Sequence, residues 1–144
     1  MQTNIDNIIM WHSAFQMGMD HPIMGVGKGN YIAEYQQVYI SPLATEPDQG
    51  HAHNNFMQYL AENGIVGLLS YLGLLTAFFT WSWKRRKNIY AMMMFTSTLA
   101  LVLYSLTDYT FAGYGAMRLY WLIMGICAIG EICNRNHLRL SVFK

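Results

Sequence analysis

Three long runs of hydrophobic residues occupy most of the C-terminal half of the chain, at residues 64–83, 89–107 and 115–133. A helix rises ~1.5 Å per residue, so about 20 apolar residues are enough to cross the ~30 Å hydrocarbon core of a bilayer. Tryptophan and tyrosine residues lie near the ends of these runs, as interfacial anchors usually do. The pattern predicts three transmembrane helices in an all-α integral membrane protein.

Residues 1–63 are more polar, and we expect them to form a helical head outside the membrane. Residues 3–20 carry apolar positions at helical spacing up to His21-Pro22, but polar residues interrupt them too often for a membrane span. The helix should lie on the membrane surface or pack on other helices. Its predicted apolar stripe consists of Ile5, Ile8, Ile9, His12, Phe15 and Met19.

A shorter helix is predicted at residues 30–40, where Tyr31, Tyr35, Val38 and Tyr39 would share one face. Such a face suits either the membrane interface or the stacking of sugars, and the interface is the commoner case. The glycine-rich turn before it lacks the complete pattern of a nucleotide-binding loop. Its glycines, Gly25 and Gly27 among them, are therefore expected to serve the conformation of the turn.

Composition and charge support this division. Hydrophobic residues make up 53% of the chain and charged residues only 12%, which is typical of membrane proteins. The basic cluster at residues 84–87 and the basic tail at 134–144 should be cytoplasmic by the positive-inside rule. Counting crossings then places residues 1–63 and the loop 108–114 on the opposite side. The sequence contains no basic patch of the kind that binds nucleic acid. No signal peptide is visible at its start. Cys127 and Cys133 are six residues apart in one predicted helix and point in different directions, so a disulfide between them is not expected.

The junction between head and membrane, His51 to Gly67, carries the strongest candidate chemistry. Asn54 or Asn55 is a good helix cap, so a helix should begin just after His53 and place that imidazole beside N–H groups that favour anions such as phosphate. A neutral imidazole there could accept a proton from a sugar hydroxyl, although it could equally hydrogen-bond its own loop. His51 and His53, near Glu46 and Asp48, form a weaker pattern for a metal site.

Four further charged residues each have two interpretations. Glu62 could orient an arginine or the acceptor, or it could face water at the bilayer edge, which the sequence favours. Asp108 and Arg118 could form an ion pair with each other or contact a phosphate. Lys28 is the one basic residue of the head, and a solvated loop lysine is its simpler explanation.

Several linked elements resemble the signature of the O-antigen ligase and polymerase superfamily. His53-Asn54 is followed, after nine residues, by Gly64-x-x-Gly67. Upstream of this pair lie Met10-Trp11 and the segment His21-Pro22-Ile23-Met24-Gly25-Val26-Gly27-x-Gly29-Asn30-Tyr31. These elements indicate the superfamily but do not separate its members.

The resemblance implies an inverting glycosyltransferase of the bacterial inner membrane. Such enzymes take a glycan from undecaprenyl diphosphate at the periplasmic face and join it to lipid A-core, a growing polysaccharide or a protein. The histidine at the place of His53 would act as base on the acceptor hydroxyl, with Asn54, Asn55 and Glu62 positioning substrate. No metal or cofactor would be required, and arginines would hold the diphosphate.

The same resemblance implies that this chain is the C-terminal third of such an enzyme. The arginine expected before Trp11 is not found in residues 1–63. It would lie upstream, or Arg118 or Lys28 would replace it, or the chain would be a non-catalytic remnant or partner subunit. A periplasmic metal-binding module built on His51 and His53 is a further alternative.

Overall fold

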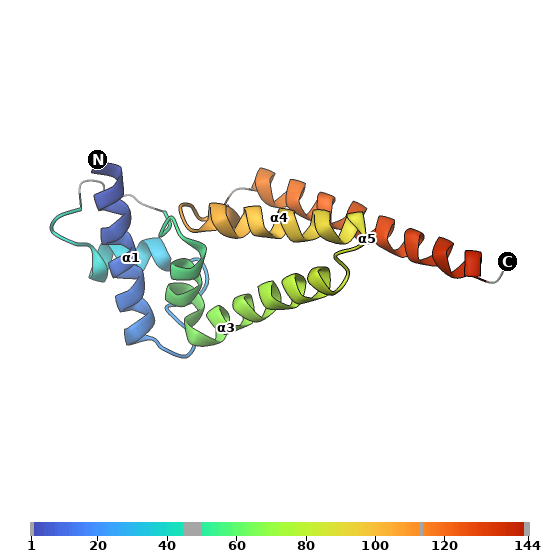
Figure 1. The fold of residues 1–144 in the computed structure, drawn as a ribbon. Helices are drawn as coiled ribbons and strands as arrows, with labels where there is room; N and C mark the ends of the chain where they lie inside the picture. Colours follow the sequence, from blue (N-terminus) through green and yellow to red (C-terminus); the bar gives the residue numbers. More distant parts are fainter. Residues whose placement is uncertain (1, 45–49, 113, 143–144) are drawn as a thin grey trace. The chain divides into compact units, whose positions relative to one another are not determined.

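A computed structural model describes residues 2–44, 50–112 and 114–142, which form helices and no β-strand within those ranges. In chain order they are α1 (Gln2–Asp20), α2 (Tyr31–Glu34), the π-helical turn η1 (Tyr35–Tyr39), α3 (Asn55–Lys84), α4 (Ile89–Ser105), the 3-10 turn η2 (Thr110–Ala112) and α5 (Tyr114–Val142) (Figure 1). The all-α prediction is confirmed.

The chain divides into two compact units. The head unit comprises Met1–Gly73 with Leu103–Ala112, and the apolar unit comprises Leu74–Val102 with Gly113–Lys144. Within the apolar unit, Met94, Tyr120, Met124 and Cys127 form a buried cluster. All of the candidate site residues except Arg118 belong to the head unit.

Within the described residues, two helices are long and apolar enough to cross a membrane, namely α3 and the segment Gly115–Asn134 of α5. The third predicted span corresponds to α4, whose 17 residues extend ~26 Å at ~1.5 Å per residue, which is at the lower limit for a transmembrane helix. The expected tail at 134–144 is not separate from the last helix, because α5 continues to Val142.

The buried face of α1 differs from the predicted stripe. Met10, Ser13, Ala14 and Met17 are buried, whereas the bulky Ile8, Phe15 and Met19 of that stripe are exposed. Small side chains and flexible methionines line the buried face because a side chain of α3 packs closely against it: a Cβ at Gly18 would lie 2.5 Å from Leu60 Cγ. The helix was predicted correctly, but the face that packs on the rest of the head unit is not the predicted apolar stripe.

The tyrosine face of residues 30–40 is also buried in the head unit. Tyr31 and Tyr35 are each 1% exposed, and their rings stack with centroids 5.9 Å apart. They join Met10, Ala14 and Met17 of α1 in the core of the unit. The interfacial interpretation is therefore wrong for Tyr31 and Tyr35, whereas Val38 is exposed.

A break in α3 at Gly64 joins this helix to the loop before α2. Gly64 has φ 61° and ψ −159°, so the helical hydrogen bonds from Ile65 and Val66 to Ala61 and Glu62 cannot form there. The freed carbonyl groups of Ala61 and Glu62 instead accept the N–H groups of Val26 (2.8 Å) and Gly27 (3.0 Å). The freed N–H groups of Ile65 and Val66 donate to the carbonyl groups of Pro22 and Ile23, so these four backbone groups find partners in the loop.

This exchange explains the predicted glycine motif. A Cβ at Gly25 would collide with the backbone at Ala61 and Glu62, and one at Gly64 would lie 2.5 Å from the carbonyl of Ile23. Gly27 adopts φ 96°, and a Cβ at Gly67 would overlap the side chain of Asn63. The conformational role predicted for the turn is confirmed. Gly25 and Gly64 of the motif lie where the loop backbone and the α3 backbone are in close contact.

Candidate functional site

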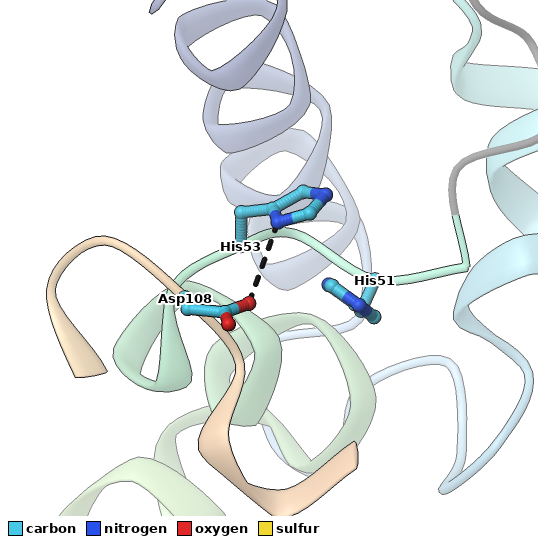
Figure 2. A group of neighbouring side chains, drawn as sticks. All are labelled: His51, His53 and Asp108. Atoms are coloured by element: carbon cyan, nitrogen blue, oxygen red, sulfur yellow. Dashed lines mark ion pairs between the residues drawn. The ribbon is translucent and has the colours of Figure 1, made fainter. Parts of the chain in front are cut away.

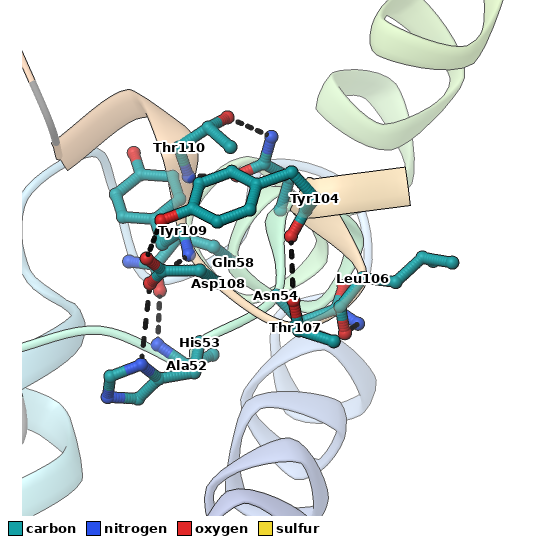
Figure 3. Close-up of polar contacts among 11 residues, drawn as sticks. Ala52, His53, Asn54, Gln58, Tyr104, Leu106, Thr107, Asp108, Tyr109 and Thr110 are labelled. Atoms are coloured by element: carbon teal, nitrogen blue, oxygen red, sulfur yellow. Dashed lines mark hydrogen bonds and ion pairs between the residues drawn. The ribbon is translucent and has the colours of Figure 1, made fainter. Parts of the chain in front are cut away.

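The start of α3 is fixed by Asn54, as the capping pattern predicted. Its Oδ1 accepts the N–H groups of Phe56 (2.9 Å) and Met57 (3.2 Å), while its Nδ2 donates to the carbonyl of Leu106 (3.2 Å). The cap thus occupies two of the N-terminal donors that were expected to attract phosphate. The buried Asn54 also ties the helix start to the segment that follows α4 (Figure 3).

Asn55 makes a second connection between the same two segments. Its Oδ1 accepts the backbone N–H of Thr110 (2.9 Å), and its Nδ2 donates to Thr110 Oγ1 (2.6 Å) and to the hydroxyl of Tyr71 (3.3 Å). Gln58 also holds the loop before α3, because its Oε1 accepts the N–H of Ala52 (2.8 Å). These buried amides hold the loop that carries the histidines.

His53 lies at the centre of this supported loop. Its φ of 47° is positive, which a residue other than glycine adopts only where the surroundings enforce it. The ring is partly exposed, with 29% of its side chain accessible, and Nδ1 lies 3.5 Å from Asp108 Oδ1. The other ring nitrogen points away from the carboxylate (Figure 2). An Nδ1–H directed at Asp108 leaves Nε2 as a proton acceptor.

Asp108 faces His53, a contact that the sequence did not predict. The carboxylate accepts the hydroxyl of Tyr104 (2.8 Å) and the backbone N–H of Tyr109 (2.7 Å). Burial alone would raise the pKa of Asp108, but these two hydrogen bonds and the nearby His51 and His53 outweigh it and lower the pKa. The side chain is therefore a fixed carboxylate beside His53.

His51 packs against the other side of His53. The two rings meet edge to face with centroids 4.2 Å apart, and Tyr109 lies 5.7 Å from His51. Burial first, and His53 second, lower the pKa of His51, while Asp108 opposes the shift. Burial also raises the pKa of Tyr109 to about 12, assisted by Glu62 and Tyr59, so its hydroxyl stays protonated at neutral pH.

Glu62 does not face water at a bilayer edge. Its side chain is buried, and Oε1 accepts the N–H of Gly29 at 3.1 Å. The carboxylate therefore anchors the far end of the glycine-rich turn, whose near end is held by the exchange at Gly64. The water-facing interpretation is wrong because the turn covers this part of α3.

The chain was compared with models of known protein families. Residues 3–72 match the family model described as O-antigen ligase. This segment, slightly less than half of the chain, is similar to the O-antigen ligase family. The match contains α1, the glycine-rich turn, the loop of His53 and the break at Gly64. No curated protein matches the chain at a significant level.

The family match concerns the general function of the matched segment. It indicates O-antigen ligase-like or polymerase-like activity, with a lipid-linked glycan and an acceptor as general substrates. Together with the two long apolar helices, it indicates a membrane protein. Asp108, which lies outside the matched O-antigen ligase segment, was not expected to face His53.

The two cationic residues predicted to contact substrate are both exposed. Lys28 is exposed at the tip of the glycine-rich turn. Arg118 is exposed on α5 and belongs to the apolar unit, apart from the O-antigen ligase segment. Their contacts with the diphosphate stay predictions, as do those of Asn54, Asn55 and Glu62 with substrate.

The predicted metal site at His51 and His53 has a third candidate ligand that the sequence did not indicate. Glu46 and Asp48 lie outside the described residues. His51, His53 and Asp108 instead place one ligand atom each within 4.8 Å of the others (Figure 2). No signal in the sequence linked Asp108 to the two histidines, because the chain between them is more than 50 residues long.

Proposed function

We propose that this chain is the C-terminal part of an O-antigen ligase-like glycosyltransferase, with His53 as its general base. The reaction would transfer a glycan from undecaprenyl diphosphate to a hydroxyl group of lipid A-core at the periplasmic face. The observation that carries the proposal is the pairing of His53 Nδ1 with Asp108 in a loop of the O-antigen ligase segment.

The geometry supports a general base in which one ring nitrogen, Nε2 of His53, is available to accept a proton. Asp108 is held by Tyr104 and Tyr109, and it faces Nδ1 of His53. A carboxylate in this place fixes the tautomer that exposes Nε2, and it stabilises the imidazolium that forms when the base accepts a proton. His53 would therefore be the catalytic residue and Asp108 a positioning residue.

The chemical step uses one acceptor hydroxyl and one glycosyl diphosphate. As the acceptor oxygen attacks the anomeric carbon, its proton passes to His53 Nε2 and the bond between that carbon and the diphosphate oxygen breaks. The undecaprenyl diphosphate leaves with the bonding electrons, and the anomeric configuration inverts. The imidazolium then returns its proton to water, which restores the neutral base.

The membrane orientation follows from charge and chain direction. We propose that α3, α4 and α5 each cross the inner membrane, with the basic turn at residues 84–87 in the cytoplasm. The segments on either side of the α3–α4 pair, 51–55 and 106–110, would then both be periplasmic. Their shared hydrogen bonds, from Asn54 to Leu106 and from Asn55 to Thr110, support this arrangement.

Charge stabilisation of the leaving group must come from outside the histidine loop. We propose Lys28 and Arg118 as ligands of the diphosphate, in addition to any arginine that precedes this segment in the whole enzyme. Each such charge-assisted contact is worth about 1.5–3 kcal/mol. Lys28→Ala should accordingly lower transfer about 10- to 100-fold.

The test is transfer of glycan to lipid A-core in cells that express the gene in its natural reading frame. His53→Ala should reduce transfer at least ~100-fold, because general-base catalysis contributes about that factor. Asp108→Asn should reduce it about tenfold or more, and Asp108→Glu should recover part of the loss. His21→Ala, at an exposed histidine of the same segment, is the matched control.

Protein abundance in the membrane must be equal for all four variants. Near-normal transfer by His53→Ala would refute the role of the base, and equal activity of Asp108→Asn and Asp108→Glu would refute a need for the carboxylate. Loss of long chains with retained capping by single repeat units would indicate a polymerase instead. Absence of any transfer by the natural protein would indicate a remnant or partner subunit.

A further inference from the structure

We propose that His51, His53 and Asp108 form a binding site for a divalent transition metal ion such as Zn²⁺, and that the bound ion inactivates His53. The first part stands on the arrangement of the three side chains, and the second part rests on the proposed function. The ligands come from two segments, the loop before α3 and the loop after α4 (Figure 2). Two histidines and one carboxylate form a common set for zinc with an open fourth position.

The distances fit a small tetrahedral ion. Zinc bonds of about 2.0–2.2 Å to nitrogen and oxygen place neighbouring ligand atoms roughly 3.4 Å apart. His53 Nδ1 and Asp108 Oδ1 are already 3.5 Å apart. The three ligand atoms lie within 4.8 Å of one another, so the widest edge closes by about 1.4 Å at most. Rotation of the His51 ring, which lies beside His53, can supply that movement.

His51 presents an independent observation. Its Nδ1 is buried and has no hydrogen-bond partner within the described part of the chain. A buried polar atom without a partner costs about 1–3 kcal/mol, so its retention calls for an explanation. A metal ion bound to His51 would satisfy the ring, whereas the proposed transfer reaction assigns no task to it.

Asp108 is held as metal-binding carboxylates commonly are. The hydroxyl of Tyr104 and the N–H of Tyr109 bond to its two oxygens, which leaves acceptor positions directed at His53. Such outer contacts orient a ligand and typically change metal affinity 10- to 100-fold when they are removed. Tyr104→Phe is therefore informative, because it alters no ligand.

Metal binding and proton transfer exclude each other at His53. An ion on Nδ1 takes the lone pair that faces Asp108, so the proton of the neutral ring must reside on Nε2. That nitrogen then becomes a donor and can no longer accept a proton from an acceptor hydroxyl. Zinc would thus act as a reversible inhibitor at the atom that the proposed reaction needs.

The first experiment measures binding in the purified full chain in detergent, with Co²⁺ as a spectroscopic probe and Zn²⁺ as the competitor. We expect one equivalent of Co²⁺ with the visible absorption of a tetrahedral site, displaced by one equivalent of Zn²⁺. His51→Gln and Asp108→Asn should each weaken binding at least tenfold, and Tyr104→Phe about tenfold. His21→Gln, at an exposed histidine of the same unit, should change nothing.

Helix content by circular dichroism must match the natural protein for each variant. Binding that is absent, or that is equal in His51→Gln and His21→Gln, would overturn the site. Tyr104→Phe provides a second criterion if a ligand variant fails to fold. Its affinity should fall while its helix content stays natural, and an unchanged affinity would contradict the oriented carboxylate.

The second experiment measures glycan transfer at increasing Zn²⁺. The natural protein should lose activity at concentrations that match its binding curve, and His51→Gln should need at least tenfold more zinc for the same loss. Equal inhibition of both would overturn the switch while leaving the site intact. If the natural protein shows no transfer at all, the proposed function and the switch fail together, but the Co²⁺ titration still decides whether the site exists.

Discussion

The break at Gly64 makes a specific prediction for Gly64→Ala. The backbone there has φ 61° and ψ −159°, a combination that is essentially confined to glycine. An added Cβ would also lie 2.5 Å from the carbonyl carbon and oxygen of Ile23 and 2.8 Å from the nitrogen of Gly25. Both neighbours are backbone atoms, so no side-chain rotation can relieve the contact.

The expected cost has two parts. Strained φ and ψ values cost about 1–3 kcal/mol, and overpacking against rigid neighbours costs about 1–3 kcal/mol more. Separating loop and helix to relieve the contact would weaken the hydrogen bonds of Val26 and Gly27, at about 0.5–1.5 kcal/mol each. A loss of about 2–6 kcal/mol follows from the strain and the overpacking, which changes the folding equilibrium at least ~30-fold.

Two other glycines provide matched controls. Gly29 has φ +83° but no atom within 4 Å of an added Cβ, so Gly29→Ala should cost only the strain of about 1–2 kcal/mol. Gly73 lies within α3 with open space around it, and Gly73→Ala should be neutral or stabilising by up to ~1 kcal/mol. Denaturation of the detergent-solubilised protein, followed by circular dichroism, measures all three.

The order of the three variants is the critical result. If Gly64→Ala is no less stable than Gly29→Ala, close approach of the two backbones contributes nothing. If it is as stable as Gly73→Ala, α3 is straight at this position and the exchange with the loop at residues 22–27 does not exist. Either result would also remove the physical explanation of the Gly-x-x-Gly spacing.

Three further predictions concern single side chains. Asn54→Ala should destabilise the protein by about 1–2 kcal/mol in denaturation, because it removes the helix cap and the bond to Leu106; Asn54→Asp should restore the cap alone, and equal stability of both variants would contradict the cap. Burial raises the pKa of Tyr31 above 10.0, so the folded state holds the phenol proton more tightly than the unfolded state does. The free energy of unfolding should therefore fall as pH rises above 10. Tyr31→Phe should lessen this fall by up to ~1.4 kcal/mol per pH unit, and an unchanged dependence of stability on pH would contradict the burial of the phenol. Arg85→Met should lower stability by about 1 kcal/mol, since the guanidinium pairs with the buried Glu131 at 3.5 Å and lies over Trp81; salt-sensitive stability of the natural protein, lost in the variant, checks the charge contribution.

Local signals in the sequence predicted local structure well. The helix expected at residues 3–20 is Gln2–Asp20, and the cap at Asn54 begins α3 where the pattern placed it. Periodicity could not select the buried face of α1, however, because bulky residues on one face and small ones on the other both recur at helical spacing. Close contact at Gly18 favours the small side, and that contact depends on another segment of the chain.

The candidate site shows the same limit more sharply. His53 was predicted from its own loop, but its contact with Asp108 was not, because the sequence suggested only an ion pair with Arg118 or a contact with phosphate for this carboxylate. The contact between His53 and Asp108 depends on how two distant loops are joined, and no periodic pattern reports that. Glu62 was misplaced for a similar reason, since its burial comes from a turn that begins more than 30 residues earlier.

The two asparagines after His53 explain how such distant loops can be held accurately. Asn54 binds the carbonyl of Leu106 while capping α3, and Asn55 binds both polar groups of Thr110. These contacts flank Asp108 on either side, so the carboxylate can approach His53 only when the start of α3 and the end of α4 are both in place. A defect in either helix should therefore uncouple the histidine from its carboxylate before it unfolds the head unit, which makes the site more sensitive than the fold to changes in α4.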